Sequence, residues 1–181
     1  AKGLTRRFEN GGGPLNILIC ENLHGGSDYL RQLVTQHLDI SVREGVLSRT
    51  GFVLAVVSRM VPLQTAEDNG GDLLAIRVEA YRELPVDGMR IVGQLPEISG
   101  VRCVDNFGAY VERKLYTHNC GHAALGYLGS VYGIEFGWQA LEDSRVRSIM
   151  QRALCESSEA LISKHDFDPA MQASYVEDLL F

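Results

Sequence analysis

The stretch Lys114-Leu-Tyr-Thr-His-Asn119-Cys-Gly-His122 places three polar side chains inside a segment that otherwise has the pattern of a buried helix. Apolar residues recur near the helical period on both sides of it, and the helix is expected to start at a cap, Asp105 or Asn106. Burying a lysine, an asparagine and a histidine among them costs several kcal/mol unless each has a partner or a task. This stretch therefore predicts a helix whose polar residues either are satisfied within the core, which the residues alone favour, or carry a functional site.

Helical geometry predicts where these side chains lie around the axis. At about 100° per residue, Lys114 and His122 are about 80° apart, and Asn119 is about 60° further on. All three can line one wall of a cleft. Small residues at positions 121, 123, 124, 126 and 129 leave room for another backbone or a ligand. The alternative is a core helix whose polar residues are simply satisfied, because polar clusters mark sites only statistically.

The spacing K-x4-N-x2-H is similar to the signature of the polyol-specific long-chain dehydrogenases, and four segments extend the resemblance. Because the matches keep one order along nearly the whole chain, it is identified as a member of this family, nearest to the mannitol-1-phosphate 5-dehydrogenases. The first two segments resemble the strand that ends the nucleotide domain (residues 14–22) and a GF…DRIVP segment (51–62). The last two resemble the catalytic helix (111–129) and the helix before an RF-N-P segment (166–181).

The resemblance implies a mostly α fold with a small β part, in which the tail end of a Rossmann-type α/β domain is followed by a largely helical substrate domain. Residues 1–25 are expected to be the last helix and strand of the dinucleotide-binding domain. Residues 26–181 are expected to form the catalytic domain, cut short at its C-terminus. Members of the family are about twice this length, and their glycine-rich fingerprint is expected outside this chain. The run Gly11–Gly13 precedes a strand, so it is interpreted as a loop. The chain alone is expected to be inactive.

Local patterns predict the remaining elements. Three aromatic residues, Tyr127, Tyr132 and Trp138, are expected in the core because large rings dominate core burial. Turn signals and alternation predict a small sheet or hairpin set after the first strand, and caps predict the later helices. The expected strands are 15–20, 52–62, 73–81 and 89–92; the expected helices are 4–10, one from Ser27 or Asp28, 138–141, one from Ser144, and one from Asp168-Pro169.

The resemblance also implies the chemistry. Lys114 would be the proton acceptor for the substrate hydroxyl, without a metal. A free lysine has a pKa of about 10.4, and desolvation would pull it toward the useful range of about 7–8. Asn119 and Asn22 would form an oxyanion pocket, in which one donor is worth about 3 kcal/mol, although Asn22 alone has the pattern of a turn residue. His122 would orient a substrate hydroxyl, and Arg59 is a candidate for substrate binding.

The implied reaction interconverts mannitol 1-phosphate and fructose 6-phosphate by hydride transfer with NAD. NADP stays open, because the residue that selects the ribose is expected outside the chain. Mannitol 2-dehydrogenase and hexuronate reductase are alternatives within the family. A different class, a helical metal-binding or dimerisation module, is suggested by His118 and His122 standing four apart. A polyol or sugar phosphate is the expected partner of a monomer or homodimer.

The composition of the chain limits its size class, its partners and its location. The chain has 181 residues, 45% of them hydrophobic, which is enough for one ordinary core. Its net charge of -6 comes without a basic stripe, so nucleic acid is not an expected partner. No apolar run reaches the length of a membrane span. The four cysteines lack C-x2-C spacing, which favours reduced thiols and a cytoplasmic location: Cys20, Cys103, Cys120 and Cys155.

Overall fold

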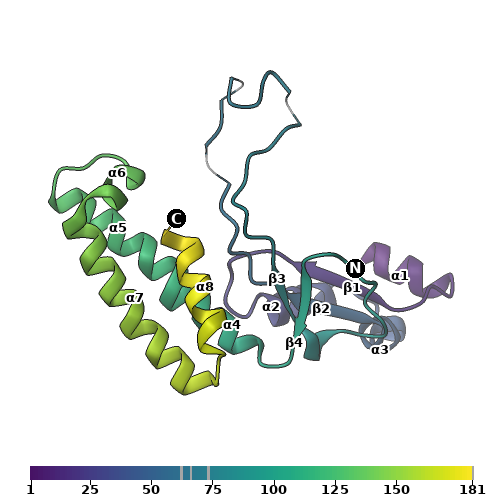
Figure 1. Ribbon diagram of the computed structural model, residues 1–181. Coiled ribbons are helices and arrows are strands. Elements are labelled where there is room, and N and C mark those ends of the chain that lie inside the picture. The colour runs from purple at the N-terminus through teal and green to yellow at the C-terminus, as the bar shows by residue number, and fades with distance from the viewer. Residues whose placement is uncertain (62, 66, 73, 181) are drawn as a thin grey trace. The chain divides into compact units, whose positions relative to one another are not determined.

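The computed structural model describes residues 1–61, 63–65, 67–72 and 74–180 (Figure 1). The chain divides into two compact units, Ala1–Phe107 and the residues from Gly108 onward. The fold is mostly helical with small sheets, as the sequence predicts. The units do not follow the boundary expected at residue 25, because the first strand pairs with a strand that comes about 35 residues later in the chain.

The first unit opens with helix α1 (Lys2–Glu9), and strand β1 (Leu15–Ile19) follows. Two helices, α2 (Gly26–Gln36) and α3 (Ile40–Ser48), then lead to strand β2 (Thr50–Leu54). β1 and β2 pair in parallel, with Leu15 opposite Thr50 and Ile19 opposite Leu54. Parallel strands need such a crossover. The first four residues of β2 are buried, as is typical of a strand covered on both faces.

A second parallel pair joins β3 (Leu84–Asp87) to β4 (Val101–Val104), with a 3-10 turn, η1 (Gly88–Arg90), between them. An antiparallel bridge between Ala55 and Val86 connects the two sheets. Val53, Ala55 and Val86 form a buried cluster at this junction. All regular strand pairs among the described residues are parallel, so of the expected small sheet or hairpin set the structure contains a small sheet and no hairpin in those residues.

The expected strands between residues 52 and 92 are largely wrong as well. β2 ends at Leu54, and no strand forms over the described residues of 73–81 or over 89–92; Pro62 and Leu73 lie outside the described residues. Within 73–81, the side-chain amide of Gln64 hydrogen-bonds the carbonyl oxygen and the N–H of Arg77, at 2.6 and 2.7 Å, in place of a strand partner. At the start of 89–92, the Asp87 carboxylate accepts from the Met89 N–H at 3.2 Å, and a turn begins there instead of a strand.

The second unit is helical. One run contains α4 (Phe107–Arg113), the segment η2 (Lys114–Asn119) and α5 (Cys120–Val131). α6 (Gly137–Glu142), α7 (Ser144–His165) and α8 (Pro169–Leu180) follow (Figure 1). Met150, Leu154 and Leu180 form one buried cluster in its core. No described helix is both long and apolar enough to cross a membrane.

Two starts of helices in this unit follow from their caps. Asp168 accepts from the Met171 N–H at 2.8 Å, which confirms the start predicted at Asp168-Pro169. Asp143, rather than the expected Ser144, caps α7 by accepting from the Arg145 N–H at 2.9 Å. The aromatic prediction is wrong: Tyr127 is 76% and Trp138 is 62% exposed, and Tyr132 is exposed too. The buried aromatic residues of this unit are Tyr110, Phe167 and Tyr175 instead.

Candidate active site

The segment Lys114–Asn119 is a π-helix set within an otherwise α-helical run. The Cys120 N–H donates to the carbonyl of Leu115, five residues earlier, where an α-helix would use the residue four earlier. π-helical turns are rare and frequently occur at functional sites. The segment begins at the expected base and ends at the expected oxyanion donor. The sequence alone predicts ordinary α-helix here.

The π turn changes which positions share a face. In an α-helix, positions 114 and 119 would lie about 140° apart around the axis. A hydrogen bond that spans five residues adds about one residue to the turn, so residues five apart lie much closer around the axis than they do in an α-helix. Lys114 and Asn119 therefore occupy one face of the run, and the angle expected for Asn119 from α-helical geometry is wrong. His122 follows Asn119 by about one α-helical turn.

Lys114 is half-buried rather than enclosed. Desolvation by its surroundings lowers the pKa of its amine below the ordinary value for lysine. The direction is the one that a general base requires, because it increases the fraction of neutral amine.

Asn119 and His122 are also half-buried. The Nδ1 atom of His122 lies 2.9 Å from the carbonyl oxygen of His118. A carbonyl only accepts, so Nδ1 carries the proton of the neutral ring and Nε2 keeps its lone pair. The Nε2 atom can then accept a hydrogen bond from a hydroxyl group.

The two histidines stand close together, with ring centroids 4.6 Å apart and planes tilted by 45°. This is the pair that suggested a metal site. In the part of the chain that the structure describes, no group of three or more His, Cys, Asp or Glu residues is arranged to hold a metal ion. The pair has no third ligand of these types among those residues.

Polar contacts from α7 and α8 hold the π segment. Ser157 Oγ donates to the carbonyl oxygen of Tyr116 at 2.5 Å. Gln172 Nε2 donates to Thr117 Oγ1 at 3.2 Å and to Ser158 Oγ at 3.1 Å. Thr117 and Gln172 are fully buried. Sequence reasoning missed these residues, since a serine or glutamine in an amphipathic helix has the same pattern whether it faces solvent or a polar partner.

Arg113, the residue before Lys114, is buried among three aromatic rings. Its guanidinium carbon lies 4.7, 5.4 and 4.3 Å from the ring centroids of Tyr110, Phe167 and Tyr175. Tyr110 and Phe167 also meet edge to face, with centroids 5.5 Å apart. Cation–π attraction strengthens when the cation is desolvated. The rings therefore fix the end of α4 next to the expected base.

The other two expected site residues belong to the first unit. Asn22 is exposed in the loop that follows β1. Arg59 is exposed, and its Nε donates to the carbonyl oxygen of Tyr81. The structure thus brings Lys114, Asn119 and His122 onto one helical run, whereas Asn22 and Arg59 lie in the other compact unit.

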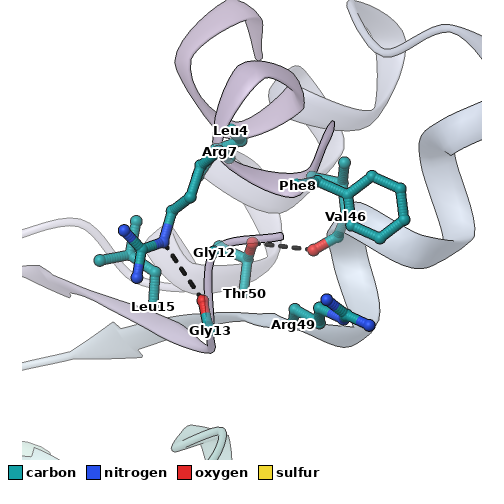
Figure 2. Close-up of a pocket in the computed structure, with 9 residues that line it drawn as sticks. All are labelled: Leu4, Arg7, Phe8, Gly12, Gly13, Leu15, Val46, Arg49 and Thr50. Atoms are coloured by element: carbon teal, nitrogen blue, oxygen red, sulfur yellow. Dashed lines mark hydrogen bonds between the residues drawn. The ribbon is translucent and has the colours of Figure 1, made fainter. Parts of the chain in front are cut away.

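A cavity in the first unit contains none of the expected site residues (Figure 2). Arg7 Nε donates across it to the carbonyl oxygen of Gly13 at 3.2 Å, and Thr50 Oγ1 donates to that of Val46 at 2.8 Å. The run Gly11–Gly13 links α1 to the start of β1. It therefore lies at the end of the strand opposite to the one where α/β sheets bind phosphate.

The chain belongs to the mannitol dehydrogenase family: residues 1–100 match the mannitol dehydrogenase Rossmann domain, and residues 106–180 match the mannitol dehydrogenase C-terminal domain. Among individual relatives, it is 40% identical over 180 residues to mannitol-1-phosphate 5-dehydrogenase of Brevibacillus brevis (strain 47 / JCM 6285 / NBRC 100599). The match covers 99% of this chain and 46% of that protein, so the chain spans about half the length of this curated relative.

Two solved structures share the fold at 21% sequence identity each. The crystal structure of D-sorbitol dehydrogenase in substrate-free form aligns with a TM-score of 0.82 over 99% of this chain and 39% of that one. The Pseudomonas fluorescens mannitol 2-dehydrogenase ternary complex with NAD and D-mannitol aligns with a TM-score of 0.72 over 98% and 38%. The boundary between the two family domains, residues 100–106, lies close to that between the compact units.

Proposed function

We propose that the chain supplies the catalytic residues of an NAD-dependent polyol dehydrogenase that interconverts mannitol 1-phosphate and fructose 6-phosphate. The observation that carries this proposal is the π-helical segment, which has a half-buried lysine of lowered pKa and an asparagine on one face of a helix. The 40% identity to a mannitol-1-phosphate 5-dehydrogenase supports the choice of substrate.

In the direction of oxidation, the neutral amine of Lys114 accepts the proton of the substrate hydroxyl. Bound NAD would supply the acceptor for the hydride that leaves the same carbon. The amide of Asn119 donates to the oxygen on which negative charge develops, and such a donor is worth about 3 kcal/mol in the transition state. His122 Nε2 accepts from a neighbouring hydroxyl and orients the chain of the polyol. In the reverse direction, protonated Lys114 returns the proton.

One segment of this chain, the loop after β1, is suited to contact NAD. The loop after β1, with Asn22, lies at the carboxyl end of a parallel strand, where α/β sheets bind their ligands. We propose that Asn22 supplies a second donor to the reacting oxygen. No G-x-G-x-x-G occurs among the 181 residues, so the pyrophosphate has no such cradle here. Arg59 is proposed to contact the substrate.

The test requires the chain extended to the full length of its curated relatives. Reduction of NAD is followed with mannitol 1-phosphate and with mannitol, and the product is identified by mass spectrometry. We expect fructose 6-phosphate to form, with kcat/KM at least about 100-fold higher for the phosphorylated substrate, since contacts to a charged group are worth several kcal/mol. A preference for mannitol would favour mannitol 2-dehydrogenase activity. No turnover of any hexitol would reject a polyol dehydrogenase.

A further inference from the structure

We propose that Gln172 and Ser157 are positioning residues that hold Lys114–Asn119 in its π-helical form and so set where the amine and the amide lie. The contacts are those described above from α7 and α8. Their importance for catalysis rests on the proposed function of Lys114. Their effect on the backbone of Lys114–Asn119 does not depend on that function.

The first step of the argument is the carbonyl of Tyr116. In an α-helix its partner would be the Cys120 N–H, four residues later. That N–H donates instead to the carbonyls of Leu115 and Thr117. Ser157 Oγ, at 2.5 Å, supplies a donor to the Tyr116 oxygen. Ser157 thus gives this carbonyl a partner from α7 at the point where the hydrogen bonding of the helix changes.

The second step concerns the middle of the segment. Thr117 is the one fully buried side chain between Lys114 and Asn119, and the Gln172 amide holds it while also bonding Ser158. Gln172 Oε1 is buried and has no hydrogen-bond partner among the described residues. A buried polar atom without a partner opposes folding. The two hydrogen bonds that its Nε2 donates link Thr117 to Ser158 of α7, so this side chain fixes where the middle of the segment lies.

The third step is that the helix is fixed on both sides of the segment. Arg113 is held by its three rings one residue before it. Gly121, two residues after it, packs so closely that an added Cβ would lie 2.6 Å from Leu179 Cδ2. The extra residue of the π turn must therefore be accommodated between these two points. Unusual backbone geometry persists where the surroundings determine it in this way.

The variants Gln172→Met and Ser157→Ala test the proposal in the 181-residue chain. Two exposed residues of α7 provide matched controls, Gln151→Met and Ser163→Ala. Amide hydrogen exchange is measured residue by residue, and the Lys114 amine is titrated by NMR of its Cε carbon. We expect amides 115–120 to exchange about tenfold faster or more in both variants, while those of α7 stay within about twofold. The Lys114 titration midpoint should move in Gln172→Met and not in the controls.

Two results would overturn the proposal. In one, exchange at 115–120 and the Lys114 titration are unchanged in both variants. In the other, protection falls equally throughout the second unit, which is what a merely structural role would produce. These readouts need no enzymatic activity. If Lys114→Ala kept its turnover while Gln172→Met still released the segment, the proposed function would fail and the positioning role would stand.

Discussion

Gly121→Ala tests how α7 and α8 pack against the helix that carries the candidate site. Gly121 is buried in α5, and a Cβ added there would lie 2.6 Å from Leu179 Cδ2, 3.3 Å from Met150 Cε and 3.6 Å from Leu154 Cδ2. Gly126 lies in the same helix, is exposed, and would place its Cβ in open space. Gly126→Ala is therefore a matched control.

The two variants share one favourable effect. Replacing a helical glycine by alanine stabilises a helix by about 1 kcal/mol, and this gain cancels in the comparison. Only Gly121→Ala adds a methyl group to a filled core, where overpacking costs about 1–3 kcal/mol. Leu179 is half-buried and must move its side-chain end, but Met150, which must also give way, is 1% exposed and has little space into which to move. We expect the free energy of unfolding of Gly121→Ala to be about 1–3 kcal/mol below that of Gly126→Ala.

Urea unfolding of the 181-residue chain measures this difference. Trp138, the single tryptophan, lies in α6 of the second unit, so its fluorescence follows the unit that contains both glycines. Far-UV circular dichroism checks that the transition includes the helices. Equal stability of the two alanine variants would refute the packing described for Gly121.

Three further predictions concern charge. Lys114→Met should raise the free energy of unfolding at pH 7, and this gain should shrink toward pH 10. The pKa of Lys114 is lowered in the folded state, so the unfolded state binds more protons. The stability of the wild-type chain therefore rises with pH. Urea unfolding at both pH values checks this, and a gain that does not depend on pH would contradict it. In the full-length enzyme, polyol oxidation should rise with pH through the pKa of Lys114 while ketose reduction falls, as initial rates in both directions will show; parallel profiles would exclude a lysine base. Arg113→Lys should cost about 1–2 kcal/mol, because an ammonium group cannot stack on the rings as a guanidinium does; exposed Arg152→Lys is the control, and equal stability of the two would refute a cation–π role.

The helices of the second unit could largely be predicted, because their start signals are local. Asp168 before Pro169 is a recognisable N-cap, and the apolar period of α7 is unbroken for several turns. The candidate residues Lys114, Asn119 and His122 could be named because their spacing resembles the signature of a known family. Their relative placement could not, because α-helical periodicity carries no sign of a π turn, and the contacts that hold it come from residues 41 to 55 positions away.

The sheets of the first unit were harder to predict, since pairing depends on distant partners. β3 contains Pro85, and proline argues against a strand; here its carbonyl accepts from the Val56 N–H at 2.9 Å. The expected strand over 73–81 had the right alternation, yet side-chain bonds from Gln64 took the place of a ladder. Gln172 is an instance of the same limit, because burial of a glutamine is decided by its partners.

The central claim is that Lys114 accepts the substrate proton, and chemical rescue tests it most directly. Lys114→Ala is prepared in the full-length enzyme, and the single-turnover rate of NAD reduction is measured with and without a small primary amine. We predict a loss of about 10²–10⁴-fold, unchanged binding of NAD, and partial recovery when the amine is added. A variant that keeps most of its rate without added amine would contradict the account.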